Sequence, residues 1–203
     1  MVNSLARRIT TSDAKSMIGG LAQNNHYLVN FSTLKSSIYN YLKRYVKEGD
    51  LKYFLGEKVG ILCSDASLPA SAYATGEVKD SFMGVPQEFA HTRLYTDISF
   101  SFYVDSDYQL LRIFEGWMEY ISSGSNRFVE QEQRGYYRRM RYPELYKADS
   151  MTISKFERNY GQTIKYKFIN AFPKSITNIP VSYSSADLLK VTVNFNYDRY
   201  VVF

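Results

Sequence analysis

The C-terminal segment 171–200, AFPKSITNIPVSYSSADLLKVTVNFNYDRY, constrains the fold more than any other part of the chain. Its second half alternates apolar and polar residues without a break, and side chains on a β-strand alternate between two faces. One face carries Leu189, Val191, Val193, Phe195 and Tyr197, and the other carries Lys190, Thr192, Asn194, Asn196 and Asp198. The pattern predicts a strand with one buried face and one wet face. A monomer would turn the wet face outward, whereas a ring of such sheets would turn it inward to line a water-filled bore, and the alternation does not choose between the two.

The composition is that of a globular chain. The 203 residues are 45% hydrophobic and 22% charged, which suits one compact domain with a substantial core. Aromatic residues are unusually frequent, with 19 Tyr and 13 Phe. Such residues favour strands and surfaces that are apolar at one end and wet at the other, so we expect extensive contact between copies of the chain.

Charge and cysteine content indicate which partners and which cellular compartment to expect. A formal net charge of +5 permits contact with nucleic acid without requiring it. Cys63 is the single cysteine and cannot form an internal disulfide, and no apolar signal segment follows Arg7 and Arg8, so we expect a reducing cytosol. No run approaches the roughly 18 apolar residues that a membrane-spanning helix needs.

Periodicity predicts six or seven strands and two helices. Strands are expected at 26–31, 89–95, 98–104, 151–156, 164–169 and 189–198, with a shorter apolar strand run at 59–63. A helix is expected from about 34 to 47, capped by Ser32 or Thr33, and irregular loops at 64–73 and 173–187. The fold class is therefore mainly β (α+β), with a helix packed against the sheet.

The second expected helix, residues 106–122, has the clearest pattern. Its apolar residues recur at helical spacing and include Trp117, which we interpret as a core residue. Asp105 or Ser106 is the expected N-cap, and Gly124 is placed to end the helix.

The sequence offers little for catalysis. His26 and His91 are the two histidines, and no metal-ligand spacing joins them to Cys63. Cys63 and His91 would make a nucleophile and base pair only if the thiol were exposed, whereas a cysteine in an apolar run is by default buried and inert. There is no glycine-rich phosphate loop, so we expect no enzyme activity, no metal and no cofactor.

An arginine-rich and tyrosine-rich segment is the one stretch whose composition indicates a binding surface. It contains Arg134, Tyr136, Tyr137, Arg138, Arg139 and Arg141. Arginines beside stacking aromatics suit a nucleic-acid surface, and the same residues are enriched in protein interfaces. We favour the interface interpretation because the segment is a single patch on a chain of modest charge.

Four segments in order resemble the tail tube proteins of contractile-tailed bacteriophages related to the T-even phages. They are HYLVNF, ILCSDASLPASAY, FAHTRLYTDISFSFYVDSDYQLLRIFEGWMEYI and NAFPKSITNIPVSYSSADLLKVTVNFNYDRY. The resemblance covers most of the chain from His26 to Tyr200. It implies a single tail-tube domain over 1–203 with a flexible arm at 1–25 and insertions at 33–52 and 124–147. The implied fold is a β-sandwich or barrel-like tail-tube fold with one packed helix and an additional inserted helix, similar to the hemolysin-coregulated tube protein of type VI secretion.

The resemblance also implies a function without chemistry. Six copies would close into a ring, rings would stack into the inner tail tube, and phage DNA would pass through it when the sheath contracts. The loop 66–86 would reach neighbouring subunits and rings, with Leu68, Tyr73, Phe82 and Val85 as candidate contacts. Because a conduit must not hold its cargo, we expect acidic and neutral polar groups in the lumen, and Asn194, Asn196 and Asp198 fit, whereas Lys190 does not.

The implied partners are other copies of the chain, the sheath protein, the baseplate tube initiator, the tail terminator, and the tape measure protein and genomic DNA in the lumen. The implied location is the virion, after assembly in the host bacterial cytoplasm. The alternatives are a baseplate tube initiator, a secretion-system tube component, or a basic β-domain that binds nucleic acid.

Overall fold

The computed structural model describes residues 22, 24–46, 51–79, 84–122, 140–157, 163–181, 183 and 187–203. Its strands are β1 (Tyr27–Thr33), β2 (Cys63–Ala66), β3 (Ser71–Val78), β4 (Gln87–Tyr95), β5 (Ile98–Tyr103), β6 (Ala148–Phe156), β7 (Thr163–Ile176), β8 (Lys190–Asn196) and β9 (Arg199–Val202). Its helical segments are α2 (Ser36–Leu42), a 3₁₀ turn η1 (Lys43–Tyr45), α3 (Leu51–Tyr53), a π-helical turn η2 (Phe54–Lys58), α4 (Val59–Leu62), α5 (Gln109–Ile121) and α6 (Pro143–Tyr146). The mainly β fold class is confirmed.

Two antiparallel sheets form the body of the protein, and β7 belongs to both. The first half of β7 lies between β6 and β9, with β1 beyond β6, and its second half pairs with β8, followed by β5 and β2. β7 changes sheet near Asn170, whose φ of 58° bends the strand, and a register shift follows between Pro173 and Ser175. Pro173 therefore lies inside a strand and not in the expected loop, because a bulge tolerates a residue that lacks an N–H donor.

Aromatic side chains fill the space between the sheets. Phe31 of β1 contacts Phe100 of β5 and Phe195 of β8, with ring centroids 6.0 and 5.4 Å apart. Trp117 of α5 is fully buried and packs edge-on against Phe195. The predicted role of Trp117 as a core residue is thus confirmed, and α5 closes one end of the sandwich.

The helical segment 51–62 was not expected. Leu51, Phe54, Leu55 and Val59 are buried at helical spacing, so residues 59–62, predicted as part of a strand run, are instead α4, and the strand β2 starts only at Cys63. This segment packs beside the edge strand β1, where Asn30 Nδ2 donates to the Gly56 carbonyl at 2.9 Å. It shields one edge of the first sheet, which would otherwise be open to pairing with another chain.

The predicted helix boundaries need two corrections. β1 continues to Thr33, and α2 starts at Ser36 with Lys35 at its N-cap position in place of the expected Ser32 or Thr33. α5 starts at Gln109 and not at 106, because Tyr108 is left-handed with φ 54°. The N-cap residue is therefore Tyr108 and neither Asp105 nor Ser106, although the Asp105 carboxylate accepts a hydrogen bond from the Leu110 N–H in the first turn at 3.3 Å.

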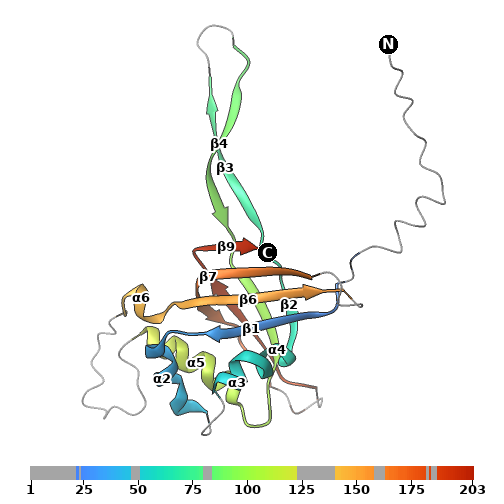
Figure 1. Cartoon of the computed structure of the whole chain (residues 1–203), viewed down its shortest axis with the longest axis vertical. Helices are drawn as coiled ribbons and strands as arrows, with labels where there is room; N and C mark the ends of the chain where they lie inside the picture. Colours follow the sequence, from blue (N-terminus) through green and yellow to red (C-terminus); the bar gives the residue numbers. More distant parts are fainter. Residues whose placement is uncertain are drawn as a thin grey trace, which may run out of the picture.

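Strands β3 and β4 form a projecting hairpin, although an irregular loop was expected at 64–73. Residues 71–78 and 87–95 pair with each other as β3 and β4, and neither strand pairs with the sheets of the body among the described residues. Figure 1 shows this hairpin, called the arm below, standing out from the sandwich at the end where the C-terminus lies. None of the helices in the described ranges is long and apolar enough to cross a membrane.

Candidate assembly surfaces

The outward face of the second sheet is polar along its whole length. Val191, Val193 and Phe195 of β8 are buried, which leaves the alternate residues on the other side of the strand. The register places Thr192 opposite Ser101 and Asn194 opposite Ser99 of β5. The alternation predicted for β8 is therefore confirmed, and we call this surface the polar face.

Side chains on the polar face bind one another. Ser101 Oγ and Thr192 Oγ1 lie 2.9 Å apart, and Asn194 Nδ2 donates to Ser175 Oγ of β7 at 2.9 Å. Asn196 Nδ2 donates to Asp97 Oδ1 at 2.8 Å. Hydroxyl and amide groups that satisfy each other across strands offer few free donors to a passing ligand.

Two lysines near this face are held by carboxylates. Lys174 Nζ donates to Asp97 Oδ2 at 2.5 Å, and this bond together with that from Asn196 holds the pKa of Asp97 below its usual value. Lys147 Nζ lies 2.6 Å from Asp198 Oδ1. Partial burial opposes ionisation of Asp198, but the bonds from Lys147 and Asn170 prevail and lower its pKa.

Lys190 is the single lysine of β8 and lies at the end of the strand far from Asp97. Its Nζ lies 4.8 Å from the centre of the Tyr103 ring, in a cation–π contact. Of the predicted set, Asn194 and Asn196 lie on the polar face, where Asn196 shares Asp97 with Lys174, whereas Asp198 follows the end of β8 and binds Lys147 and Asn170. No sequence pattern had linked these charged partners to β8, because they are distant in the chain.

The arm carries large exposed side chains. Tyr73 on β3 is 59% exposed, Val85 beyond its end is 82% exposed, and Leu68 before its root is 50% exposed. Phe82, the fourth predicted contact, lies outside the described residues. Phe89 and Leu94 of β4, half exposed, were missed by the sequence analysis because their strand had been expected to lie in the body.

Arg141 has a local structural partner. Its Nε donates to the Tyr120 carbonyl at 2.8 Å, and its guanidinium lies 4.3 Å from the centre of the Tyr120 ring. It therefore satisfies a carbonyl at the C-terminal end of α5. Arg134, Tyr136, Tyr137, Arg138 and Arg139, the rest of the predicted interface or basic patch, lie outside the described residues.

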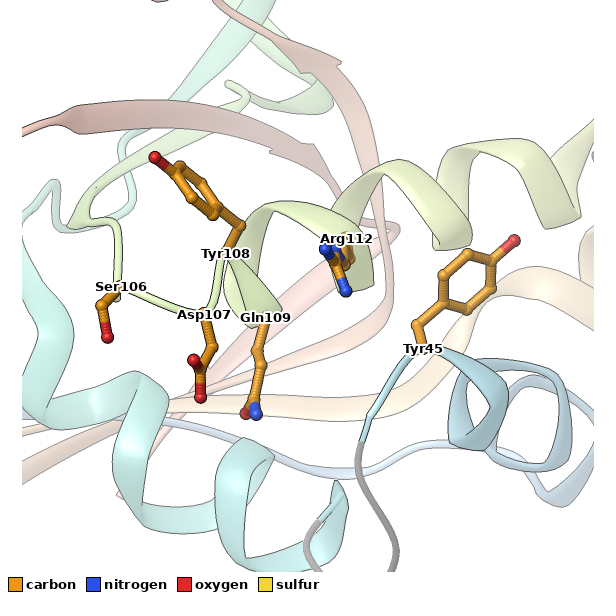
Figure 2. A pocket seen from close by; sticks show the side chains of 6 residues that line it. All are labelled: Tyr45, Ser106, Asp107, Tyr108, Gln109 and Arg112. Atoms are coloured by element: carbon orange, nitrogen blue, oxygen red, sulfur yellow. The ribbon is translucent and has the colours of Figure 1, made fainter.

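A shallow hollow of about 330 Å³ lies at the start of α5. Figure 2 shows Tyr108 pointing away from Asp107 and Gln109, and the Tyr45 ring pointing away from all three. A ligand pocket needs convergent polar groups, so we assign this hollow no role.

The single thiol is buried. Cys63 is 8% exposed at the start of β2, and burial raises its pKa to about 12. Its own carbonyl accepts a hydrogen bond from the Tyr27 hydroxyl at 3.0 Å. This environment is that of a structural cysteine and not of a nucleophile.

Comparison with known proteins agrees with this architecture. The profile of the phage tail tube protein family matches residues 22–203, and the chain belongs to that family. This makes it a structural component of a tail tube and not an enzyme. A search of curated protein sequences finds no significant match.

Solved structures of contractile injection systems share the fold. The sheath/tube terminator of the PVC extracellular contractile injection system has a TM-score of 0.53 and 15% identity, over 90% of this chain and 96% of that chain. The PVC sheath-tube complex has a TM-score of 0.52 and 15% identity, over 96% of this chain and 99% of that chain. The baseplate of the anti-feeding prophage has a TM-score of 0.55 and 12% identity, over 90% of this chain and 95% of that chain. At these identities the likeness shows a common fold.

Proposed function

We propose that this chain is the subunit of the inner tube of a contractile tail. Six copies close into a ring, rings stack into a tube, and phage DNA passes through the bore when the surrounding sheath contracts. The observation that carries this proposal, beyond membership of the tail tube family, is the polar face, beside which Lys174 and Lys147 are each paired with a carboxylate.

The polar face has the chemistry that a DNA conduit requires. Free lysines in the bore would bind phosphates and release counterions, which slows transit. Lys174 and Lys147 are each held by a carboxylate, at 2.5 and 2.6 Å, and β8 contributes the neutral Asn194 and Asn196 to the polar face. We therefore propose that Asn194, Asn196 and Asp198 face the lumen.

The strand count supports a bore wide enough for a duplex. The second sheet contributes β2, β5, β8 and the second half of β7. Joined edge to edge around a ring of six, these four strands exceed the about 16 to 18 strands that already enclose an aqueous channel. Closure of the ring would also pair strand edges that a lone subunit leaves open.

The partners follow from this role. Other copies of the chain form the tube wall, the sheath surrounds it, a baseplate initiator and a tail terminator bind its ends, and the tape measure protein and genomic DNA occupy the lumen. We place the protein in the virion after assembly in the host bacterial cytoplasm. Solved structures of similar fold include a sheath-tube complex and a sheath/tube terminator, which supports the sheath and the terminator as partners.

A role at the end of the tube is the second candidate. A terminator and a baseplate component share the fold with TM-scores of 0.53 and 0.55. A tube subunit stacks into filaments of many rings, whereas a tube initiator or terminator stops at one or two rings.

Sedimentation and negative-stain electron microscopy across a concentration series test the proposal. Long tubes with an open bore are the expected result, and single rings would favour the end role. Monomers at every concentration that shift a DNA duplex in a gel would instead favour a basic nucleic-acid-binding domain. The same gel is the control for the assembled tube, which we expect not to retain duplex DNA on its surface.

A further inference from the structure

The first sheet has one face toward the core and one face toward the outside. Ile153 of β6 and Phe168 of β7 are fully buried, and their neighbours along each strand point to the other side. Residues that pair across an antiparallel ladder share a face, and Lys167 of β7 pairs with Thr152 of β6 and with Val201 of β9. Lys167 therefore lies on the outward face, on the side of the sandwich opposite to the polar face of the second sheet.

Three cations occupy successive rows of this outward face. Lys165 pairs with Phe203 through two backbone hydrogen bonds of 2.9 and 3.1 Å, and Lys167 lies two residues further along β7. Arg199 pairs with Ile169, the next outward residue of β7. Rows of one face are about 7 Å apart, because each strand residue advances the chain by about 3.4 Å. We call this surface the basic face, and it consists of Lys165, Lys167, Arg199, Val201 and Phe203.

The charges of the basic face are not compensated by carboxylates. Among the residues that the structure describes, none of these three cations forms an ion pair. Lys165 and Arg199 are exposed and Lys167 is half-buried, so all three charges can be reached from solvent. The acidic residues in or next to β6 and β9 are each paired with another lysine, namely Asp149 with Lys35, Glu157 with Lys155 and Asp198 with Lys147.

The two outward faces of the sandwich therefore differ in charge. At the polar face Lys174 is bound by Asp97, whereas the basic face leaves three like charges side by side. Like charges about 7 Å apart repel each other, and an anion placed along them removes that repulsion and is attracted to each of them. The basic face is suited to a partner with several negative charges, and the polar face is not.

The neighbours of the cations indicate that this partner is a protein. Val201 and Phe203 are 37% and 69% exposed and lie beside the cations on β9. Aromatic side chains and arginine are enriched in protein interfaces, where apolar groups add contact area to the ion pairs. Neutralising about three phosphates would make only a weak, salt-dependent site for nucleic acid.

We propose that the basic face binds an extended acidic segment of another protein, with a carboxylate at every second residue. Alternate residues of an extended chain point to one side and lie about 7 Å apart, which is the spacing of the rows that carry Lys165, Lys167 and Arg199. The position of this face on the outside of the tube rests on the proposed function. If the polar face lines the bore, the first sheet is turned outward, where the protein that surrounds the tube supplies the segment.

Fluorescence anisotropy of the soluble protein with two labelled peptides tests the spacing. One peptide has five Glu-Ser repeats and the other has five Glu-Ser-Ser repeats, so both carry the same number of carboxylates. The first presents a carboxylate to each of the three rows, whereas the second places carboxylates on one side only at every sixth residue and reaches one row at a time. Exposed ion pairs each strengthen binding about twofold, so the first peptide should bind about fourfold more tightly.

Two triple variants of equal net charge test the face itself. Lys165→Gln, Lys167→Gln and Arg199→Gln together should weaken binding of the Glu-Ser peptide about eightfold and abolish the difference between the peptides. The control variant replaces three exposed lysines outside the first sheet by glutamine and should keep the fourfold difference; they are Lys43, Lys52 and Lys190.

Three results would overturn the inference. Equal affinity of the wild type for both peptides, or equal losses in the two triple variants, would mean attraction without a site. No binding of either peptide would mean that the face does not take an acidic segment. A DNA duplex that displaces the Glu-Ser peptide and binds more tightly to the wild type than the peptide does would assign the face to nucleic acid.

The assembled tube tests where the basic face lies. Thiol-reactive gold particles should mark the outer surface of Lys165→Cys tubes and the bore of Thr192→Cys tubes in electron micrographs, since the native Cys63 is buried. Gold in the bore of K165C tubes would contradict both the outward position and the proposed function. The peptide measurement needs no tube, so a subunit that distinguishes the peptides but never assembles would uphold the binding site and refute the tube.

Discussion

Substitution of Gly60 by alanine tests how the helical segment 51–62 shields the edge of β1. A Cβ atom at Gly60 would lie 2.5 Å from the backbone carbonyl oxygen of Val29 and 2.7 Å from Leu28 Cδ1. The carbonyl belongs to a strand paired with β6 and cannot move aside, so α4 must lift from β1. Overpacking costs about 1 to 3 kcal/mol, and the rigid neighbour argues for the upper end of that range.

The net effect follows from two opposing contributions. Alanine in place of glycine favours a helix by roughly 1 kcal/mol, which leaves a loss of about 2 kcal/mol in the free energy of unfolding. With a urea dependence of about 2.5 kcal/mol per M, the unfolding midpoint of Gly60→Ala should fall by about 0.8 M, measured by circular dichroism.

Gly76→Ala is the matched control. Its Cβ atom would lie 2.8 Å from Phe89 Cζ, a similar distance, but the neighbour is the end of a half-exposed side chain that can swing away. We expect its midpoint to stay within about 0.2 M of the wild-type value, a shift typical of surface positions. A Gly60→Ala midpoint equal to or above wild type would refute the close packing of α4 on β1.

Three further predictions concern single side chains. The Tyr197 hydroxyl is buried with no hydrogen-bond partner among the described residues, so Tyr197→Phe should raise the free energy of unfolding by about 1 kcal/mol. Urea titration measures this change, and a loss of stability would reveal a partner for the hydroxyl. The Cys63 thiol, whose pKa burial raises to about 12, should react with a disulfide reagent at about pH 8 only at the rate of opening, and prompt reaction would contradict its burial. The pKa of Asp97 is lower in the folded than in the unfolded protein, so its ionised form stabilises the fold above the unfolded pKa of about 3.9, and this stabilisation is lost as the pH falls through the folded pKa. The urea midpoint of Asp97→Asn should therefore fall less steeply below about pH 4 than that of the wild type. Equal slopes would exclude the Asp97–Lys174 pair.

Local patterns predicted the parts of the fold that local sequence determines. The alternation of β8 and the apolar stripe of α5 are each written in consecutive residues, so both elements were recognised and Trp117 was placed in the core. The β3 half of the arm was taken for a loop because its small residues, such as Ala72 and Ala74, give a weak alternation, whereas a strand was predicted at 89–95, in β4. Its strands are fixed by pairing with each other.

Long-range contacts explain the remaining misses. Gly56 and Gly60 disfavour a helix over residues 51–62, yet Gly60 is what lets α4 approach β1. The ion pair between Asp97 and Lys174 joins residues 77 positions apart, so no motif could have placed both on the polar face. The candidate lumen residues Asn194 and Asn196 belong to one strand, whereas Asp97 and Lys174 come from other parts of the chain.

Cryo-electron microscopy of the assembled protein tests the central claim most directly, because it shows both the symmetry and the surface that meets the bore. The account predicts stacked six-fold rings in which the polar face, with Asn194 and Asn196 of β8, lines an open channel wide enough for a DNA duplex, and Lys174 remains paired with Asp97. Rings that place the polar face on the outside, or a bore lined by unpaired lysine or arginine side chains, would contradict it.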